Sequence, residues 1–335
     1  MKDHLFSNEF RLEDLTKKDP LVAIAHLVHW SLFERELERM LPTKEQPKGG
    51  RPPYKKLLLF KIVFLQQYYG LSDESAEYQI KDRLSFMRFL GLGMADNVPD
   101  QNTVWLFKES LKEDNRMEKL FDLFTAHLRK KNIILNKGSI VDASIVKAPI
   151  QRNSRDENER LKKGDTPEWT DKKKSHKDTD AKWTSKNNKN YYGYKNHIKV
   201  DIKTKLITRA KVTTAEVHDS QVILELIDKR DNGHVLYADS AYSGKELKAA
   251  LKGKGVHPRV HQKGTKNKPL TAIQQGRNHE KSKTRARVEH VFGNMKQRCG
   301  EVMVRAVGIL RNERDIMMKN LTYNISRAVY LMRTT

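Results

Sequence analysis

The sequence is short of the features that mark secreted, membrane-bound and nucleotide-driven proteins. Cysteine occurs once in 335 residues, as Cys299, which excludes an internal disulfide and a zinc site built on several thiolates. No run approaches the roughly 20 apolar residues of a membrane span, and the charged N-terminus lacks the apolar stretch of a signal peptide. Neither a phosphate-binding P-loop nor a GxGxxG pattern after a strand is present. We therefore expect a cytoplasmic protein whose chemistry needs no nucleotide.

Basic residues are in large excess over acidic ones. Lys and Arg number 65 and Asp and Glu 42, which gives a formal charge of +23. Such a charge attracts polyanions and makes two free copies of the chain repel each other. Nucleic acid is the partner that this balance favours. The 37% hydrophobic content is enough to bury a core in a chain long enough for two domains.

Residues 1–131 are predicted to form an all-α N-terminal domain. Helical spacing of apolar residues covers about 20–41, 54–69, 85–90, 102–111 and 117–131, and a further helix begins near Ser72. Pro20 and Gly70 stand where a helix start and a helix stop are expected. The aromatic residues at helical spacing are expected in the core; they are Trp30, Trp105, Phe107, Phe121 and Phe124.

Residues 132–335 are predicted to form a mixed α/β domain. Short β-branched segments at about 138–146, 197–202, 206–214, 234–239 and 256–260 indicate strands. Helical patterns cover about 219–229, 244–251, 285–298 and 311–333. The order is three strands, then helices and strands in alternation. It fits an RNase H-like sheet, in which three antiparallel strands lead into parallel strands covered by helices.

Two lysine-rich stretches are predicted to be insertions in this domain, at about 151–192 and 261–284. Residues 151–200 carry 14 Lys or Arg against 8 Asp or Glu, and residues 251–287 carry 11 against one. Such segments form either solvated flexible loops or a surface for DNA phosphates, and we favour the second. Trp169 and Trp183, both in the first insertion, either stack on an unpaired base or anchor the insertion to the core.

Three acids occupy positions where a fold does not place carboxylates by default. Asp142 interrupts an apolar strand, Asp239 ends another strand just before a turn, and Glu289 lies on a basic helix. If the two strands are neighbours, the two aspartates emerge side by side and the helix can bring Glu289 across them. Three carboxylates with open coordination positions suit one or two Mg²⁺ ions on a scissile phosphate.

The sequence segments around these acids resemble those of the DDE transposases of bacterial insertion sequences, and among them the group named after insertion sequence five. VDASIV, YADSAYSG and RARVEHVFGNMK are similar to the three catalytic blocks of that group, with Arg285, Glu289 and Lys296 at its spacing. Ser282 stands where many relatives have Tyr. NYYGYKNHIKVD, AEVHDSQ and the helical segments from about residue 50 extend the resemblance to about residue 330.

The resemblance implies Asp142, Asp239 and Glu289 as catalytic metal ligands for Mg²⁺, with Mn²⁺ as a substitute and two ions per site. The expected partners are double-stranded DNA, namely the inverted-repeat ends and the target, and a second copy of the chain in a homodimer formed on DNA. The implied setting is the bacterial nucleoid, and the helical domain is expected to bind the ends. The predicted DNA contacts are Arg285, Lys296, Arg287 and Lys283.

Several alternatives stay open at this point. His197 and His218 are either structural or support the metal site from behind its ligands. A nuclease of the same fold would cut DNA without joining it, and an inactive relative would only bind DNA. Strand-transfer products would distinguish the expected transposase, which cleaves the ends by metal-dependent hydrolysis and joins the freed 3′-hydroxyls to target DNA.

Overall fold

The computed structural model describes residues 18–42, 52–165, 167–186, 188–265, 267–299 and 303–334. The charged N-terminal segment, in which no signal peptide was expected, and the side chain of Cys299 lie outside these residues. Two compact units are present, one of residues 1–127 with 321–335 and one of residues 128–320. The predicted division after residue 131 lies within four residues of this one, but the grouping of the C-terminal residues with the helical unit was not predicted.

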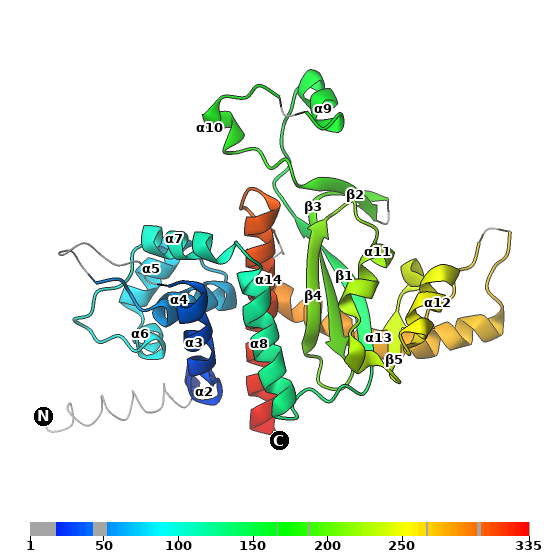
Figure 1. The fold of residues 1–335 in the computed structure, drawn as a ribbon, viewed down its shortest axis with the longest axis horizontal. Helices are drawn as coiled ribbons and strands as arrows, with labels where there is room; N and C mark the ends of the chain where they lie inside the picture. Colours follow the sequence, from blue (N-terminus) through cyan, green and yellow to red (C-terminus); the bar gives the residue numbers. More distant parts are fainter. Residues whose placement is uncertain are drawn as a thin grey trace, which may run out of the picture. The chain divides into compact units, whose positions relative to one another are not determined.

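The first unit is helical, as predicted. Its helices are α2 (Pro20–Leu27), α3 (Trp30–Met40), α4 (Lys56–Tyr69), α5 (Asp73–Asp82), α6 (Leu84–Leu90), α7 (Gln101–Leu111) and most of α8 (Arg116–Lys130) (Figure 1). Gly70 ends α4 in the left-handed conformation, with φ of 68°, and the Ser72 side chain caps α5. Aromatic rings fill the core, where the Trp30 ring lies 5.6 Å from that of Phe64.

Two expectations for this unit were wrong. The helix predicted over residues 20–41 is broken at Val28, whose backbone is extended. The break is needed because Val28 and Trp30 are both buried, and two positions so spaced face different sides of a straight helix. Trp105 was expected in the core, but its residue is 46% exposed, since the buried face of α7 is formed by Val104, Phe107 and Leu111.

The second unit contains a six-stranded mixed sheet. Its strands are β1 (Ser139–Lys147), β2 (Lys182–Lys186), β3 (Lys189–Asp201), β4 (Ile207–Thr214), β5 (Val235–Ala238) and β6 (His257–Val260). β3 is antiparallel to β1 and β4, whereas β5 is parallel to β1 and β6 to β5. The spatial order β4-β3-β1-β5-β6, with β2 paired to the start of β3, confirms the predicted RNase H-like arrangement.

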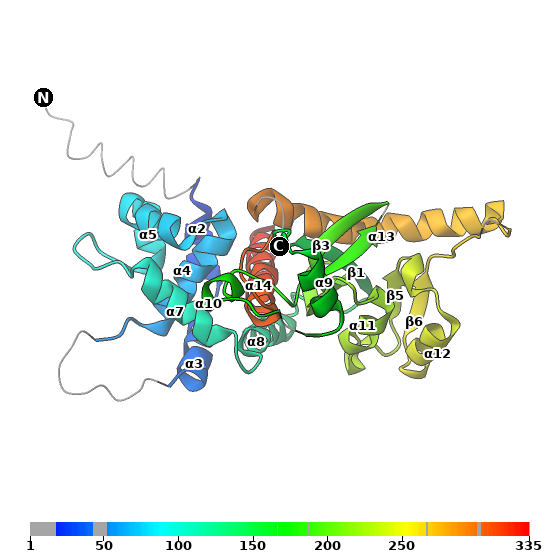
Figure 2. The same cartoon turned by 90° about the horizontal axis from the view of Figure 1, so that it is seen from above.

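Helices cover the two faces of this sheet. α11 (Asp219–Leu226) and α12 (Lys245–Gly253) lie on one side of β1 and β5, and α13 (Ala272–Cys299) crosses the other side (Figure 2). On the first face, Val141 and Leu236 pack against Ile223 and Leu251 in a continuous apolar cluster. The first half of α14 (Ile309–Thr334) is joined to the sheet by a buried amide pair, in which Asn196 and Asn320 exchange hydrogen bonds of 2.8 and 3.0 Å.

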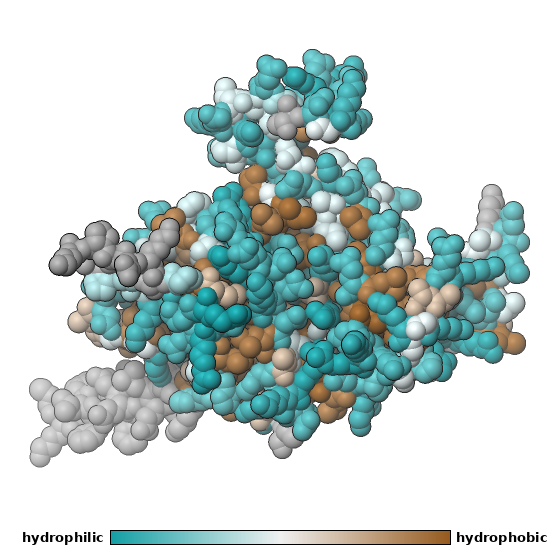
Figure 3. Space-filling view, viewed as in Figure 1, coloured by the Kyte–Doolittle hydropathy of each residue, from teal (hydrophilic) through white to brown (hydrophobic). Residues whose placement is uncertain are grey.

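The two predicted insertions are more ordered than their composition suggested. The first contains α9 (Arg155–Lys162), α10 (Asp171–Lys174) and β2, and its helical part forms a mostly hydrophilic lobe at the top of Figure 3. The second is a loop only up to residue 271, because α13 begins at Ala272 and includes residues 272–284. Glu289 therefore lies in the middle of a long helix rather than near its start. Among the described residues, no helix is long and apolar enough to cross a membrane.

Candidate active site

Asp142 and Asp239 lie on neighbouring parallel strands. Ser139 of β1 is opposite Leu236 of β5, and Ile140 is opposite Tyr237. Continuing this register by two residues sets Asp142 level with Asp239, which directly follows β5. The charge of Asp239 raises the pKa of Asp142, so the two carboxylates interact. The structure therefore brings these two acids to the same place on neighbouring strands, and their catalytic role stays a prediction.

The Asp142 carboxylate is costly to ionise. Its side chain is 15% exposed, and burial raises its pKa to about 6, with a further contribution from Asp239. Partners oppose this rise: the Ala143 N–H donates to Oδ1 at 2.9 Å and Arg285 donates to Oδ2 at 3.1 Å. Lys186 also lowers the pKa through its charge. Asp142 is therefore a largely buried carboxylate whose ionised form is stabilised by a backbone N–H and by the charges of Arg285 and Lys186.

Asp239 is held by the turn that follows it. Its Oδ1 accepts a hydrogen bond of 2.8 Å from the N–H of Ala241, the second residue of the short helix η2 (Ser240–Tyr242). This cap fixes the carboxylate at the carboxyl end of β5, the end at which open α/β sheets bind ligands.

Glu289 reaches the aspartates through Arg285. Both residues lie on α13, one turn apart, and the Glu289 Oε1 atom is 3.6 Å from Arg285 Nη2. The same guanidinium bonds Asp142, so Arg285 joins an acid of the sheet to an acid of the helix. The Glu289 side chain is 65% exposed, against 15% for Asp142. Glu289 thus lies at the open side of this cluster.

The sequence that carries these acids matches a known protein family. A family model described as the transposase DDE domain matches residues 135–325. The chain belongs to this family. A second model, described as a transposase domain, matches residues 10–110. The chain is an insertion-sequence-type DDE transposase, whereas the group named after insertion sequence five stays a prediction.

Three solved structures are similar to this transposase at low identity. A piggyBac transposase in a synaptic complex with hairpin DNA is 12% identical, with a TM-score of 0.47, over 94% of this chain and 76% of that one. The Mos1 transposase in a paired-end complex with its left transposon end is 10% identical, with a TM-score of 0.21, over 68% and 64%. The Mos1 strand transfer complex is 10% identical, with a TM-score of 0.26, over 87% and 81%.

DDE transposases use divalent metal ions, and the acids of this transposase fit one by their chemistry. Carboxylate oxygens are the ligands that hard divalent cations prefer. Burial is the main cause of the raised pKa of Asp142 and the charge of Asp239 adds to it; a cation between the two carboxylates would relieve both. In the described part of the chain, however, no three His, Cys, Asp or Glu side chains form a ready-made metal cage. Arg285 supplies the positive charge at this place.

The four predicted DNA contacts have different surroundings on α13. Arg285 bonds the acids, and Arg287 donates to the backbone oxygen of Ile202 at 2.8 Å, which fixes the helix to the sheet. Lys283 is paired with Glu280 at 2.7 Å on the helix surface, and Lys296 is exposed. Contacts of these residues with DNA stay predictions.

The two histidines have structural surroundings. His197 is fully buried, its Nε2 lies 2.9 Å from Thr213 Oγ1, and burial lowers its pKa to about 4. His218 caps α11, where its Nδ1 accepts from the N–H of Ser220 at 3.3 Å. Both geometries favour the structural alternative over support of a metal site.

Sequence reasoning missed Tyr242, which lies beneath the acids. Its hydroxyl is buried without a hydrogen-bond partner in the described structure. Burial raises its pKa, and the charges of Asp219, Asp142 and Asp239 raise it further. The position of Tyr242 three residues after Asp239 was visible in the motif, but nothing in the sequence says that the ring turns inward.

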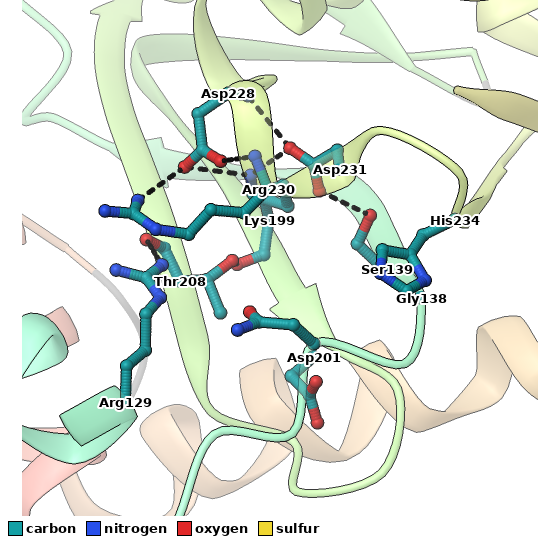
Figure 4. A pocket seen from close by; sticks show the side chains of 11 residues that line it. Arg129, Gly138, Ser139, Lys199, Asp201, Thr208, Asp228, Arg230, Asp231 and His234 are labelled. Carbon is teal, nitrogen blue, oxygen red and sulfur yellow. Dashed lines mark hydrogen bonds and ion pairs between the residues drawn. The ribbon is translucent and has the colours of Figure 1, made fainter. Parts of the chain in front are cut away.

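A second cluster of charges lies at the start of β1, around Ser139. Lys199 is almost fully buried between Asp231, 2.6 Å from its Nζ, and Asp228, at 3.7 Å (Figure 4). Ser139 donates to Asp231 at 3.5 Å, and Arg230 bonds Asp228 at 3.3 Å. The cavity that these residues line has about 10 Å³, room for a water molecule rather than a substrate. The ion pairs of this cluster fix β3 against η1 (Lys229–Asp231).

Proposed function

We propose that Asp142, Asp239 and Glu289 together bind two Mg²⁺ ions, which Mn²⁺ can replace, and that this site cuts the ends of an insertion sequence and joins them to a target. The observation that carries the proposal is the facing pair Asp142 and Asp239, with Glu289 linked to it by Arg285. When bound, the ions would activate the attacking oxygen and stabilise the leaving one.

The residues of the chain have distinct parts in this proposal. Asp142 and Asp239 are fixed by backbone N–H groups, so they supply the rigid side of the site. Glu289 is exposed and held only by a 3.6 Å pair, so it can turn towards the ions at little cost. Arg285 then exchanges its carboxylate partners for a DNA phosphate, which is the role predicted for it.

The charges of the two units bear on which of them supplies DNA affinity. Residues 1–127 with 321–335 carry 21 Lys and Arg against 20 Asp and Glu, whereas residues 128–320 carry 44 against 22. Phosphate contacts, which dominate affinity, therefore come mainly from the catalytic unit. We propose that the helical unit binds the inverted repeats, and that it does so by contacting base edges rather than by attracting phosphates through a net positive charge.

We propose that the working form is a homodimer assembled on DNA at the bacterial nucleoid. Two ends must be cut and joined to one target, and one set of three acids per chain implies two chains. Mutual repulsion of the basic units opposes the dimer until phosphates neutralise them.

A strand-transfer assay tests this function. The donor is the gene with its own flanking DNA, the target is a supercoiled plasmid, and the reaction contains Mg²⁺. We expect joined products that carry short inverted repeats at the junctions, and two chains per complex by light scattering with DNA. Cleavage without joined products would indicate a nuclease, and DNA binding without cleavage an inactive relative. Joining by a complex with one chain would contradict the dimer.

A further inference from the structure

His261 lies in one row with the two aspartates of the site. Val260, the last residue of β6, is paired with Ala238, the last residue of β5. The pairing continues beyond β6, because the N–H of His261 donates to the backbone oxygen of Ala238 at 3.2 Å. His261 is therefore level with Asp239, as Asp239 is with Asp142, on strands that are about 4.8 Å apart. The row runs across β1, β5 and β6, and the last two strands end at it.

The side chain of His261 points to the same face of the sheet as the two carboxylates. The residues that precede the three all belong to the apolar cluster packed against α11 and α12; they are Val141, Ala238 and Val260. Side chains alternate between the faces of a strand, so Asp142, Asp239 and His261 face α13, which crosses the other side (Figure 2). Contacts with α13 agree, since Arg285 bonds Asp142 and Ser282 lies 3.2 Å from His261.

The helix α13 holds the segment around His261 in place. Asn278 donates from Nδ2 to the backbone oxygen of Gln262 at 2.9 Å, and its Oδ1 accepts from the N–H of Gln262 at 3.0 Å. Lys281 donates to the backbone oxygen of Val260 at 2.7 Å. The residues on both sides of His261 are thus bound to the helix that also carries Glu289, so the imidazole is fixed relative to the acids.

The contacts of the imidazole assign its proton. Nε2 lies 3.2 Å from the backbone oxygen of Asn278 and 3.2 Å from the hydroxyl of Ser282. A carbonyl oxygen only accepts, so Nε2 carries the proton and donates it. Nδ1 then has a lone pair, for which the described residues provide no donor. Burial and the charge of Arg285 lower the pKa of His261, against a smaller opposing effect of Asp239, so the lone pair is available at neutral pH.

The lone pair of Nδ1 restricts what this atom can bind. The oxygens of a DNA phosphate carry no hydrogen, so they are not partners for it. In the proposed reaction the protons at the site belong to the attacking oxygens, which are those of water in cleavage and of the 3′-hydroxyl in joining. A Mg²⁺ ion prefers oxygen ligands to imidazole, which makes metal binding at Nδ1 the poorer fit. An acceptor fixed beside the acids therefore suits an attacking O–H group.

We propose that His261 is a further catalytic residue, whose Nδ1 atom accepts the proton of the attacking oxygen. As that oxygen forms its bond to phosphorus, its proton passes to Nδ1. The bond between phosphorus and the leaving 3′ oxygen breaks, the electron pair stays on this oxygen, and the oxygen takes up a proton from solvent. The imidazolium then returns its proton to solvent. This inference rests on the proposed function and deepens it by naming the base.

Cleavage of end DNA in Mg²⁺ tests this role. We expect His261→Ala to cleave about a hundredfold more slowly than wild type, as the loss of a general base predicts, and added imidazole to restore part of the rate. His261→Asn keeps an oxygen acceptor but cannot take up a proton, so it should stay slow. His257→Ala removes an exposed histidine at the start of the same strand, and should cleave as wild type with no response to imidazole.

Binding measurements separate a catalytic role from a structural or metal-binding one. His261→Ala should bind end DNA in Ca²⁺, and Mn²⁺ without DNA, as tightly as wild type. If His261→Ala does not fold, the slow cleavage and wild-type Mn²⁺ affinity expected of His261→Asn decide. Normal cleavage by the variants, no rescue by imidazole, or weaker Mn²⁺ binding would overturn the proposal and leave the transposase function in place. Absence of cleavage by wild type would overturn both.

Discussion

The fold holds Asp142 in a largely buried position, where its ionised form is unfavourable. Binding of a metal ion or of a proton removes this cost. The folded pKa of Asp142, about 6, lies above the ordinary 3.8, so the unfolded chain loses the proton first as pH rises. The stability that this group contributes is full below pH 3.8, falls between there and about 6, and is absent above. The loss over this window is at most about 3 kcal/mol.

We therefore predict that Asp142→Asn is more stable than wild type at pH 8 without metal, although the change removes a predicted ligand. Urea unfolding in EDTA measures this, and the gain should shrink towards pH 4. Added Mn²⁺ should stabilise wild type and not the variant. Glu280→Gln, which changes an exposed carboxylate of α13, is the control. A variant less stable than wild type at pH 8 would mean that the pair with Arg285 outweighs the cost of burial.

Individual residues also show what sequence patterns leave out. Asp142 could be singled out in the sequence because a carboxylate inside an apolar strand needs a compensating charge, which Arg285 provides in the structure. The exposure of Trp105 and Trp183 could not be predicted, since spacing places a residue on a face but does not say whether another element covers that face. Tyr242 was missed because the inward turn of its ring depends on the packing of α11 against η2.

The helix α13 carries the cation and the third acid of the site. Arg285 and Glu289 are one turn apart, so the helix itself fixes the separation of their backbones. Arg285→Gln should bind Mn²⁺ about tenfold more tightly at pH 8, because a competing positive charge is gone, and should cleave DNA more slowly. Arg285→Lys keeps the charge, so its affinity for Mn²⁺ should equal that of wild type. Weaker metal binding by Arg285→Gln would show instead that Arg285 holds the carboxylates for the ion.

The start of α13 was misplaced for a physical reason. Residues 272–284 are almost wholly polar and lack the apolar stripe by which a helix is found in a sequence. The strands of the sheet were easier, because β1 and β4 are runs of β-branched residues bounded by turns. The β2 strand, with the pattern KWTSK, has no such run and was taken into an insertion.

The charge of the whole molecule is concentrated in one of its two units, and this predicts its response to salt. Lys263→Gln with Lys268→Gln, two exposed lysines of the loop before α13, should reduce the slope of log affinity against log salt by up to about 1.8, at about 0.9 per phosphate contact. Lys55→Gln with Lys119→Gln, exposed in the helical unit, should leave the slope unchanged. Equal effects of the two pairs would place phosphate contacts on both units.

Cleavage of end DNA by single acid variants tests the account most directly. With Mg²⁺ present, we predict no detectable cleavage by Asp142→Asn, Asp239→Asn or Glu289→Gln, and DNA affinity close to that of wild type, because the ions need the carboxylates whereas affinity comes from phosphate contacts elsewhere. Glu280→Gln, on the same helix as Glu289, should cleave normally. Near-normal cleavage by any of the three variants, or full activity of wild type in excess EDTA, would contradict the account.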